Sequence, residues 1–206
     1  MSQPSDLGAP SLLPLVDAPP VERRDAARNR ENLVRAAERL IARCGVDRVT
    51  MDALAAEAGV GKGTVFRRFE SREGLMAALL DHTETEWQQR VISGPPPLGP
   101  GAEPWDRLVA FGRSRIETTI LHADLIRNAG RYGGRSYAAY SFHAMHVRLL
   151  LTDLGVEGDL PLLVVALLAP LEAPILDQLV RIEELDVDRV HAGWVDLARR
   201  IVRCPD

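Results

Sequence analysis

Cationic and hydroxyl side chains are concentrated in one short stretch of the chain, residues 61–72, which reads GKGTVFRRFESR. Lysine and arginine donate hydrogen bonds to anionic oxygens, and arginine can match two oxygens of a phosphate with two parallel bonds. The two glycines leave the backbone open to close approach by another molecule. The stretch therefore has the chemistry of a site for a polyanion, built on Lys62, Thr64, Arg67, Arg68 and Arg72.

Two short helices joined by a tight turn are expected to position this stretch. Thr50 is expected to cap the first helix, whose inward face is Met51, Leu54, Ala55 and Ala58. Gly59 ends that helix, because glycine adopts the left-handed conformation without steric cost. The second helix then offers three side chains to the core, Val65, Phe66 and Phe69. Two helices crossed by a short glycine-bearing turn are typical of a helix-turn-helix, which lays its second helix in the DNA major groove.

The segment from about Arg24 to Leu80 resembles the DNA-binding domain of the TetR family of transcriptional regulators. The most specific part of the resemblance is AGVGKGTVFRRF at Ala58–Phe69, followed by SREGL at Ser71–Leu75. The glycines, the threonine, the aromatic residues and the serine cap stand in the order typical of that family. The resemblance therefore implies a DNA-binding function for this segment.

The resemblance also implies a role for each residue of the motif. Lys62, Thr64 and Arg67 are expected to meet base edges or nearby phosphates. A further three, Thr50, Arg68 and Arg72, are expected to meet phosphates. Phe66 departs from the family, which usually has a tyrosine there whose hydroxyl reaches a phosphate. The full set of expected DNA-contacting residues is Arg23, Arg24, Thr50, Gly61, Lys62, Gly63, Thr64, Phe66, Arg67, Arg68 and Arg72.

The charge of the chain is uneven, although its net charge is only −4. Between residues 23 and 48 there are eight arginines against four acidic residues, a balance of +4. An acidic protein with one basic end is typical of a DNA reader that docks through that end. A solvated, charged helix face is the alternative, and the adjacent helix-turn-helix favours the DNA reader.

Several classes of protein are disfavoured by the sequence. Cys44 and Cys204 have neither metal-ligand spacing nor the density of a disulfide framework, and Cys44 is interpreted as a small core residue. The apolar run Leu160–Leu171 is too short to span a bilayer, and the first 20 residues lack the basic start of a secretory signal. His143 and His146 are three apart, but a third metal ligand is missing. A cytoplasmic protein without a cofactor or a metal is expected.

The remainder of the chain has helical rather than alternating periodicity. Pro170 and Pro174 are expected to bend the helix that contains them, because each removes a backbone hydrogen bond. The helices expected outside the helix-turn-helix cover residues 24–44, 71–91, 105–123, 124–131, 136–154, 160–184 and 187–202.

The predicted fold is all-α, with about nine helices in two parts. Its N-terminal part is a three-helix helix-turn-helix DNA-binding domain, and its C-terminal part is a helical ligand-binding and dimerisation domain. The predicted divisions are a disordered tail (1–21), the DNA-binding domain (22–91), a loop (92–104) and the C-terminal domain (105–206).

The last two predicted helices carry apolar stripes that are candidates for a homodimer interface. A pair of such helices can meet the same pair of a second subunit as a four-helix bundle. Packing within one subunit is the alternative for each residue. Trp194 is the expected hot spot of an interface formed by Leu167, Leu171, Leu179, Val190, Trp194, Leu197 and Ile201.

The middle helices combine apolar residues with a few polar ones, which is typical of the wall of a small-molecule pocket. The tentative pocket consists of Phe111, Arg115, Ile116, Asn128, Tyr137, Tyr140, His143 and Met145.

Together, the motif and the TetR resemblance predict a one-component transcriptional regulator. A homodimer is expected to bind a palindromic operator in double-stranded DNA and to act as a repressor that a small-molecule effector releases. Two alternatives stay open, a helical enzyme and a helical interaction module whose helix-turn-helix serves only for packing. The sequence shows no nucleophile beside a base, which disfavours the enzyme.

Overall fold

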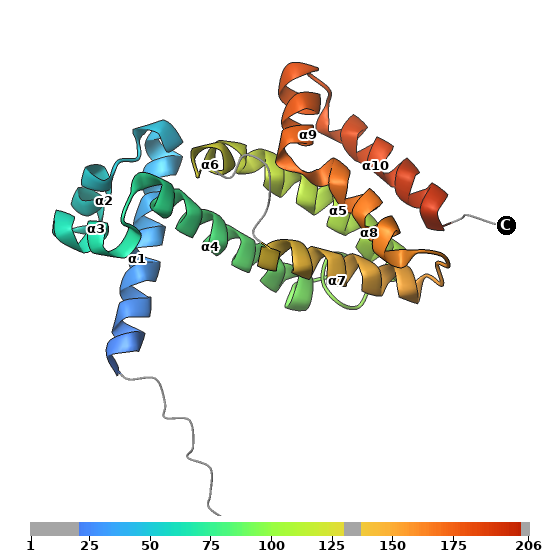
Figure 1. The fold of residues 1–206 in the computed structure, drawn as a ribbon, viewed down its shortest axis with the longest axis horizontal. Helices are drawn as coiled ribbons and strands as arrows, with labels where there is room; N and C mark the ends of the chain where they lie inside the picture. Colours follow the sequence, from blue (N-terminus) through green and yellow to red (C-terminus); the bar gives the residue numbers. More distant parts are fainter. Residues whose placement is uncertain (1–20, 130–136, 203–206) are drawn as a thin grey trace, which may run out of the picture.

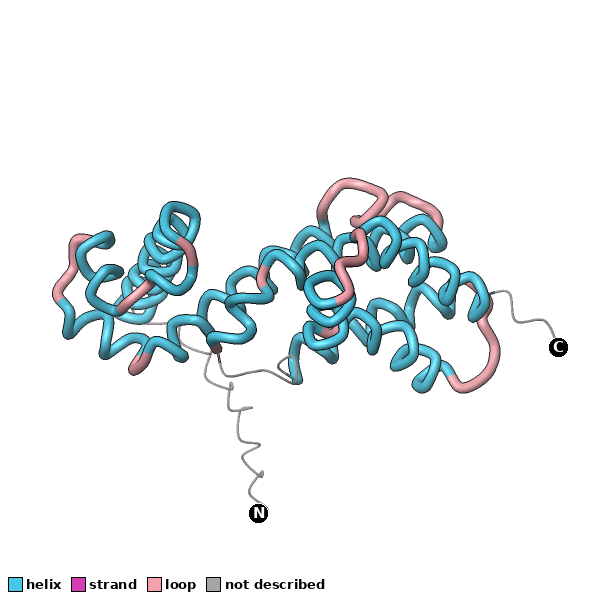
Figure 2. Tube along the Cα trace, turned by 90° about the horizontal axis from the view of Figure 1, so that it is seen from above, coloured by secondary structure: helices cyan, strands magenta, loops and turns pink. Residues whose placement is uncertain are grey.

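The computed structural model describes residues 21–129 and 137–202, and these residues form helices without any strand. The predicted N-terminal tail, and the side chains of Arg23, Arg24 and Tyr137, lie outside the described residues. The helices form two groups joined by one long helix, α4 (Arg72–Ser93) (Figure 1). Figure 2 shows the same two groups from above, with helices connected by short loops. The predicted all-α fold is confirmed.

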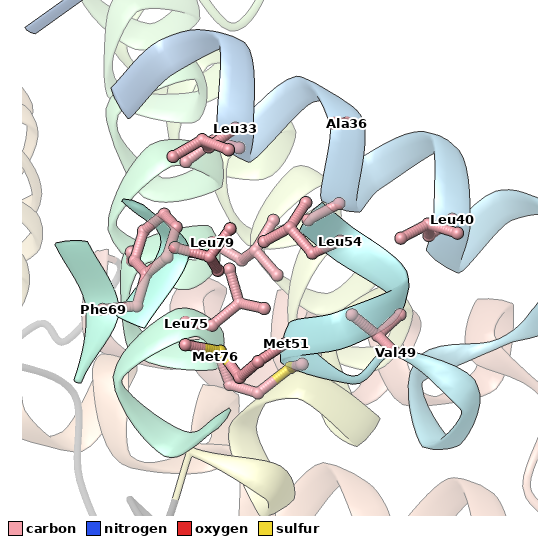
Figure 3. Packing of buried hydrophobic residues seen from close by; sticks show 14 of the residues in the cluster. Leu33, Ala36, Leu40, Val49, Met51, Leu54, Phe69, Leu75, Met76 and Leu79 are labelled. Carbon is pink, nitrogen blue, oxygen red and sulfur yellow. The ribbon is translucent and has the colours of Figure 1, made fainter. Parts of the chain in front are cut away.

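The N-terminal group consists of α1 (Val21–Cys44), α2 (Met51–Ala58), α3 (Lys62–Phe69) and the first turns of α4. Its core is a compact cluster of aliphatic side chains with one phenylalanine (Figure 3). The fully buried members include Leu54 of α2, Val65 of α3 and Leu75 of α4. Each of these helices therefore contributes an apolar face to the same centre, which fixes the orientation of α3.

Caps and one glycine define the helix-turn-helix as the sequence predicts. Thr50 Oγ1 accepts a hydrogen bond from Ala53 N at 3.1 Å and so begins α2. Gly59 ends it in the left-handed conformation, with φ 66° and ψ 30°. At the start of α4, Ser71 Oγ accepts from Gly74 N at 3.1 Å. A short 3₁₀ turn, η1 (Val46–Arg48), precedes α2 and was not predicted.

Two expectations about the N-terminal core are wrong. Cys44 is exposed, because it is the last residue of α1 and lies beyond the helices that cover the core. Phe66 is 47% exposed, whereas Val65 and Phe69 are buried. Since α3 lies over the core with a single face, only one side of this eight-residue helix can be buried.

The C-terminal group contains α5 (Pro104–Leu121), α6 (Ala123–Asn128), α7 (Tyr137–Asp153), α8 (Leu160–Leu168), α9 (Ala173–Asp177) and α10 (Val187–Val202). The single helix predicted for residues 160–184 is broken by a 3₁₀ turn, η2 (Ala169–Leu171), and ends in a π-helical turn, η3 (Gln178–Ile182). Its two halves, Leu160–Leu171 and Ala173–Ile182, meet at 41°. The break coincides with Pro170 and Pro174, as expected from their missing backbone donors.

The two groups share α4, so the expected boundary after residue 91 does not separate two independent cores. Leu75 and Leu79 at its start belong to the N-terminal core, whereas Trp87 and Val91 are buried in the C-terminal core. Conversely, Leu125 of α6 is buried in the N-terminal core. The N-terminal core therefore contains side chains from α4 and α6 as well as from the helix-turn-helix.

Three of the predicted interface residues are core residues of the same chain. Leu167 and Leu171 are fully buried, and Trp194 is 4% exposed with its Nε1 donating to Leu167 O at 2.8 Å. The indole ring also lies directly against Gly112 of α5, where a Cβ atom would come within 2.1 Å of it. Periodicity placed these three residues on apolar stripes, but their side chains are covered by neighbouring helices of the same subunit.

Within the described part of the chain, no single helix is long and apolar enough to cross a membrane. The bent pair around Pro170 would reach that length only when its two halves are counted together. Several of its members, such as Leu167, Leu171 and Leu176, are buried in the protein core.

Candidate nucleic-acid interface and interior site

The outward face of α3 is basic, and its inward face is anchored. Val65 and Phe69 are buried in the N-terminal core, so they hold the helix in place. The opposite face of α3 carries three exposed cations, Lys62, Arg67 and Arg68. A short helix fixed by its apolar face and presenting cations to solvent is the arrangement that a major-groove reader requires.

The start of α3 is sterically open. Gly61 is the residue before the first helical turn, and a Cβ atom built on Gly61 or on Gly63 would meet no atom within 4 Å. Thr64 is half-buried beside this opening. A duplex backbone or a base edge can therefore approach the first turn of α3 closely, which is what the two predicted glycine positions require.

Two exposed cations of the helix-turn-helix, Lys62 and Arg67, interact with groups at the protein surface. Lys62 Nζ lies 2.6 Å from Asp52 Oδ2, and both side chains are more than half exposed. Arg67 Nε donates to Gly63 O at 3.2 Å, within its own helix. Exposed pairs of this kind contribute little to stability, so phosphates can compete for these cations.

Arg72 does not match its predicted role. Its three guanidinium nitrogens donate to Val49 O (3.0 Å), Val46 O (2.9 Å) and Asn128 Oδ1 (2.7 Å). The side chain is partly buried and ties the turn before α2 to the start of α4 and the end of α6. Three of the five guanidinium N–H donors of Arg72 are therefore used within the protein, which favours a structural role over the expected phosphate contact.

The arginines of α1 are also partly paired. Arg39 Nε and Arg43 Nη2 both donate to the carboxylate of Glu57 on α2, at 3.2 and 2.6 Å. These pairs join α1 to α2 at the surface. A cleft of about 420 Å³ lies between the two helices at this place, lined by Asn29, Asn32, Leu33, Arg35, Arg39, Glu57, Ala58 and Val60.

A charged network occupies the interior of the C-terminal group, where α4, α5 and α7 meet. Glu84 of α4 accepts from Arg115 Nη1 at 2.8 Å and lies 2.7 Å from His143 Nε2. The guanidinium of Arg115 also lies over the ring of Trp87, 5.1 Å from its centroid. Burial alone would raise the pKa of Glu84, but the hydrogen bond with His143 and the charge of Arg115 lower it to about 2.

Aromatic rings surround this network. Trp87 packs edge-on against Phe111 and His143, with ring centroids 5.5 and 5.0 Å apart. Phe142 stacks against His146 with a centroid distance of 6.3 Å. This interior site, where α4, α5 and α7 meet, therefore combines an ion pair with a surrounding wall of aromatic rings.

The predicted pocket residues are divided by the structure. Arg115, His143, Phe111 and Ile116 are buried at the interior site, and Tyr140 is half-buried beside it. Two others lie elsewhere: Met145 is 64% exposed, and Asn128 is at the end of α6 with Arg72. Neither residue therefore lies at the interior site, because position in the sequence alone does not specify which side of a helix faces inward.

Sequence reasoning missed Glu84 and Trp87. A signal was present, because Leu80, Glu84, Trp87 and Val91 recur at spacings of four, three and four along α4. A single carboxylate on an apolar helical stripe predicts either a buried ion pair or a functional group.

One group of side chains in the described ranges has the composition of a metal site. Glu38 of α1 and Glu86 of α4 flank His82, whose Nε2 lies 3.7 and 3.4 Å from their carboxylate oxygens. The side chains of Glu38 and Glu86 are 38% and 66% exposed, so the three residues have the geometry of a surface ion-pair cluster. We assign no metal to it.

Comparison with known proteins agrees with this geometry. Residues 33–79 match the family model described as bacterial regulatory proteins, tetR family. This range contains the helix-turn-helix and most of its core. No curated protein matches the chain.

Solved structures share the fold over nearly their whole length. A TetR-like transcriptional regulator from Rhodococcus sp. RHA1 has a TM-score of 0.57 at 20% identity, covering 84% of this chain and 94% of that one. FadR of Thermus thermophilus, a TetR family repressor in complex with lauroyl-CoA, has 0.58 at 21% identity, covering 86% and 96%. RolR in complex with resorcinol has 0.57 at 20% identity, covering 88% and 96%.

Proposed function

We propose that this chain is a TetR-type transcriptional regulator, and that it acts as a homodimeric repressor released from its operator by a small-molecule effector. The observation that carries the proposal is α3, whose buried face fixes the helix while its basic face and open first turn point to solvent. The matched family consists of regulatory proteins, which favours this function over the enzyme alternative.

In the proposed complex, α3 enters the major groove with its N-terminal turn first. Lys62 and Thr64 lie in that turn and contact base edges, and Gly61 and Gly63 let the backbone approach the duplex. Arg67 and Arg68 follow in the last turn and neutralise phosphates. Thr50 Oγ1 accepts the cap hydrogen bond from Ala53 N, which leaves the hydroxyl hydrogen of Thr50 to donate to a phosphate at the start of α2.

The dimer interface proposed here is the outer face of the segment from α8 to η3. Exposed apolar side chains are concentrated on this segment, namely Leu162 (65%), Val165 (46%), Ile175 (41%) and Ile182 (66%). Such a concentration is typical of a surface that a partner covers. Of the residues predicted from the sequence, Leu179, Val190, Leu197 and Ile201 are half-buried and remain available at its edge.

The interior site between α4, α5 and α7 is the proposed effector site. FadR and RolR, which share the fold, were solved with lauroyl-CoA and with resorcinol respectively. In the present chain, Glu84 connects α4 to α5 through the ion pair with Arg115 and to α7 through the hydrogen bond with His143. A ligand that enters there and competes for these partners releases α4.

Helix α4 then connects the two sites. Glu84 lies in its second half, and Arg72 at its first residue holds the turn before the helix-turn-helix. A ligand shifts this equilibrium only if it binds the released conformation more tightly than the fastened one. The proposed effector therefore changes the separation of the two α3 helices in the dimer and lowers operator affinity.

Titration of the purified protein against the DNA that flanks its own gene tests this function. Phosphate neutralisation releases counterions, so the logarithm of the affinity should fall steeply and linearly with the logarithm of the salt concentration. A scrambled duplex of the same length is the control. Absence of binding to the flanking DNA, or an affinity that is equal for both duplexes, would favour the interaction-module alternative.

A further inference from the structure

The described residues contain four buried side-chain polar atoms without a hydrogen-bond partner, and all four lie on two helices that pack together. Three belong to α5, namely Arg107 Nε, Arg115 Nε and Thr119 Oγ1. The fourth is His146 Nε2 on α7, which packs against α5. Buried polar groups are nearly always paired, so such a concentration in one place requires an explanation.

The unpaired atoms border a single region. Residues 107, 111, 115 and 119 are four apart and therefore form one ridge along α5. Phe111, in the middle of this ridge, lies 5.4 Å from the ring of His146 and 6.2 Å from that of His143. The ridge thus faces α7, and the unpaired atoms lie at both ends of an apolar, aromatic surface.

The charge of this region is unbalanced. Arg115 is 5% exposed and pairs with Glu84, whereas Arg107 forms no ion pair with any described residue. Burial, followed by the charge of Arg107, lowers the pKa of His146 to about 4, so this imidazole is neutral at pH 7. Of the two guanidinium groups on this ridge, that of Arg115 has a carboxylate partner among the described residues and that of Arg107 does not.

We propose that the effector is an apolar carboxylate, with an aromatic or similarly compact body, bound along the α5 ridge. Its carboxylate accepts hydrogen bonds from Arg115 Nε and Thr119 Oγ1, and Arg107 contributes further positive charge. Its apolar body packs against Phe111 and Phe142. The proposal rests on the proposed function, since it names the chemical class of ligand for the same site.

This assignment also gives the ligand a means of acting on α4. A carboxylate at Arg115 Nε brings a second negative charge close to Glu84, which accepts from Nη1 of the same guanidinium, and the repulsion between the two carboxylates weakens the link from α4 to Arg115. A neutral analogue of the same shape lacks this competing charge. Selectivity for the acid over its amide is therefore the property that separates this proposal from general apolar binding.

Thermal unfolding of the full chain with 2-naphthoate and with 2-naphthamide tests the class of ligand. At a concentration of about 1 mM, 2-naphthoate should raise Tm by about 3 °C and 2-naphthamide should leave it unchanged. Equal shifts with the acid and the amide, or no shift with either, would overturn the proposal. In the last case, water would be the partner of the unpaired atoms.

Two variants test the residues. Arg115→Gln should abolish the shift caused by 2-naphthoate, but it also leaves Glu84 without its cation and can prevent folding. Thr119→Val keeps the ion pair and nearly the same volume, and it should reduce the shift by half or more. Thr118→Val, at the neighbouring position on α5, is the matched control and should retain the whole shift. A full shift in Thr119→Val would contradict the assignment.

The outcome can be separated from that of the proposed function. DNA binding without selectivity for the acid would overturn only the ligand class. Selectivity for the acid in a protein that binds no DNA would support the ligand site and contradict the proposed repressor.

Discussion

The guanidinium of Arg72 donates to Asn128 Oδ1 at 2.7 Å, and this bond joins the first residue of α4 to the last residue of α6. The same side chain donates to two carbonyl groups in the turn before α2, those of Val46 and Val49. One arginine therefore connects the C-terminal group to the helix-turn-helix. These contacts favour a structural role for Arg72 over the phosphate contact expected from the sequence.

Replacing Arg72 by alanine distinguishes the two roles. We expect the free energy of unfolding to fall by about 2 kcal/mol, because a partly buried charged donor and its partners are lost. The salt dependence of DNA binding should stay unchanged. Arg68→Ala is the control, since loss of a phosphate contact should make the salt slope shallower by about one unit. A shallower slope in Arg72→Ala would restore the phosphate role.

The contact between Trp194 and Gly112 makes a second prediction. Gly112→Ala places a methyl group against the indole ring, so we expect a loss of stability of about 1–3 kcal/mol despite the higher helix propensity of alanine. Gly193→Ala on α10 is the matched control, because its Cβ meets nothing within 4 Å. Urea unfolding measures both. A Gly112→Ala protein as stable as Gly193→Ala would contradict the packing described here.

The proposed dimer interface is tested by a charge on its exposed face. Val165→Glu should yield a monomer with unchanged helical content, because this side chain is 46% exposed in the subunit. Operator affinity should fall by about 100-fold or more, since one α3 helix reads too few base pairs. Light scattering and circular dichroism provide the measurements. Leu121→Glu, at a position 77% exposed on α5, is the control and should remain dimeric.

The buried imidazole of His146 should make stability depend on pH. Its pKa falls from an ordinary 6.5 to about 4, chiefly through burial, so the folded protein binds fewer protons than the unfolded chain between these values. Stability is therefore lost as the pH falls from 6.5 to 4. His146→Gln should make this decline shallower, by up to about 1.4 kcal/mol per pH unit. Identical slopes in urea titrations of both proteins would refute this origin.

The helix-turn-helix was predictable because its determinants are local. The cap at Thr50, the left-handed Gly59 and the spacing of Leu54, Val65 and Phe69 are all readable within 20 residues of sequence. The roles of Arg72 and Trp194 were not predictable. Arg72 pairs with Asn128 and Trp194 with Leu167, and both partners are distant in the sequence. Periodicity shows which face of a helix is apolar or cationic, but it does not show which residue that face contacts.

The interior site was predicted in part for the same reason. Arg115 and His143 were expected to be polar groups in an apolar wall, and they are buried there. Their common partner Glu84 comes from the helix that the sequence assigned to the other domain. A helix shared by two cores has no signature in composition, because each half has the ordinary pattern of its own core.

Selection of preferred sites from a random pool of duplexes tests the central claim most directly. The account predicts that the protein enriches an inverted repeat, with half-site centres about one helical turn apart or a multiple of it. It also predicts that Thr64→Ala alters the preferred bases within each half-site, whereas Arg68→Ala weakens binding to all sequences alike. Enrichment of no sequence, or of a sequence without two-fold symmetry, would contradict a dimer that reads DNA through α3.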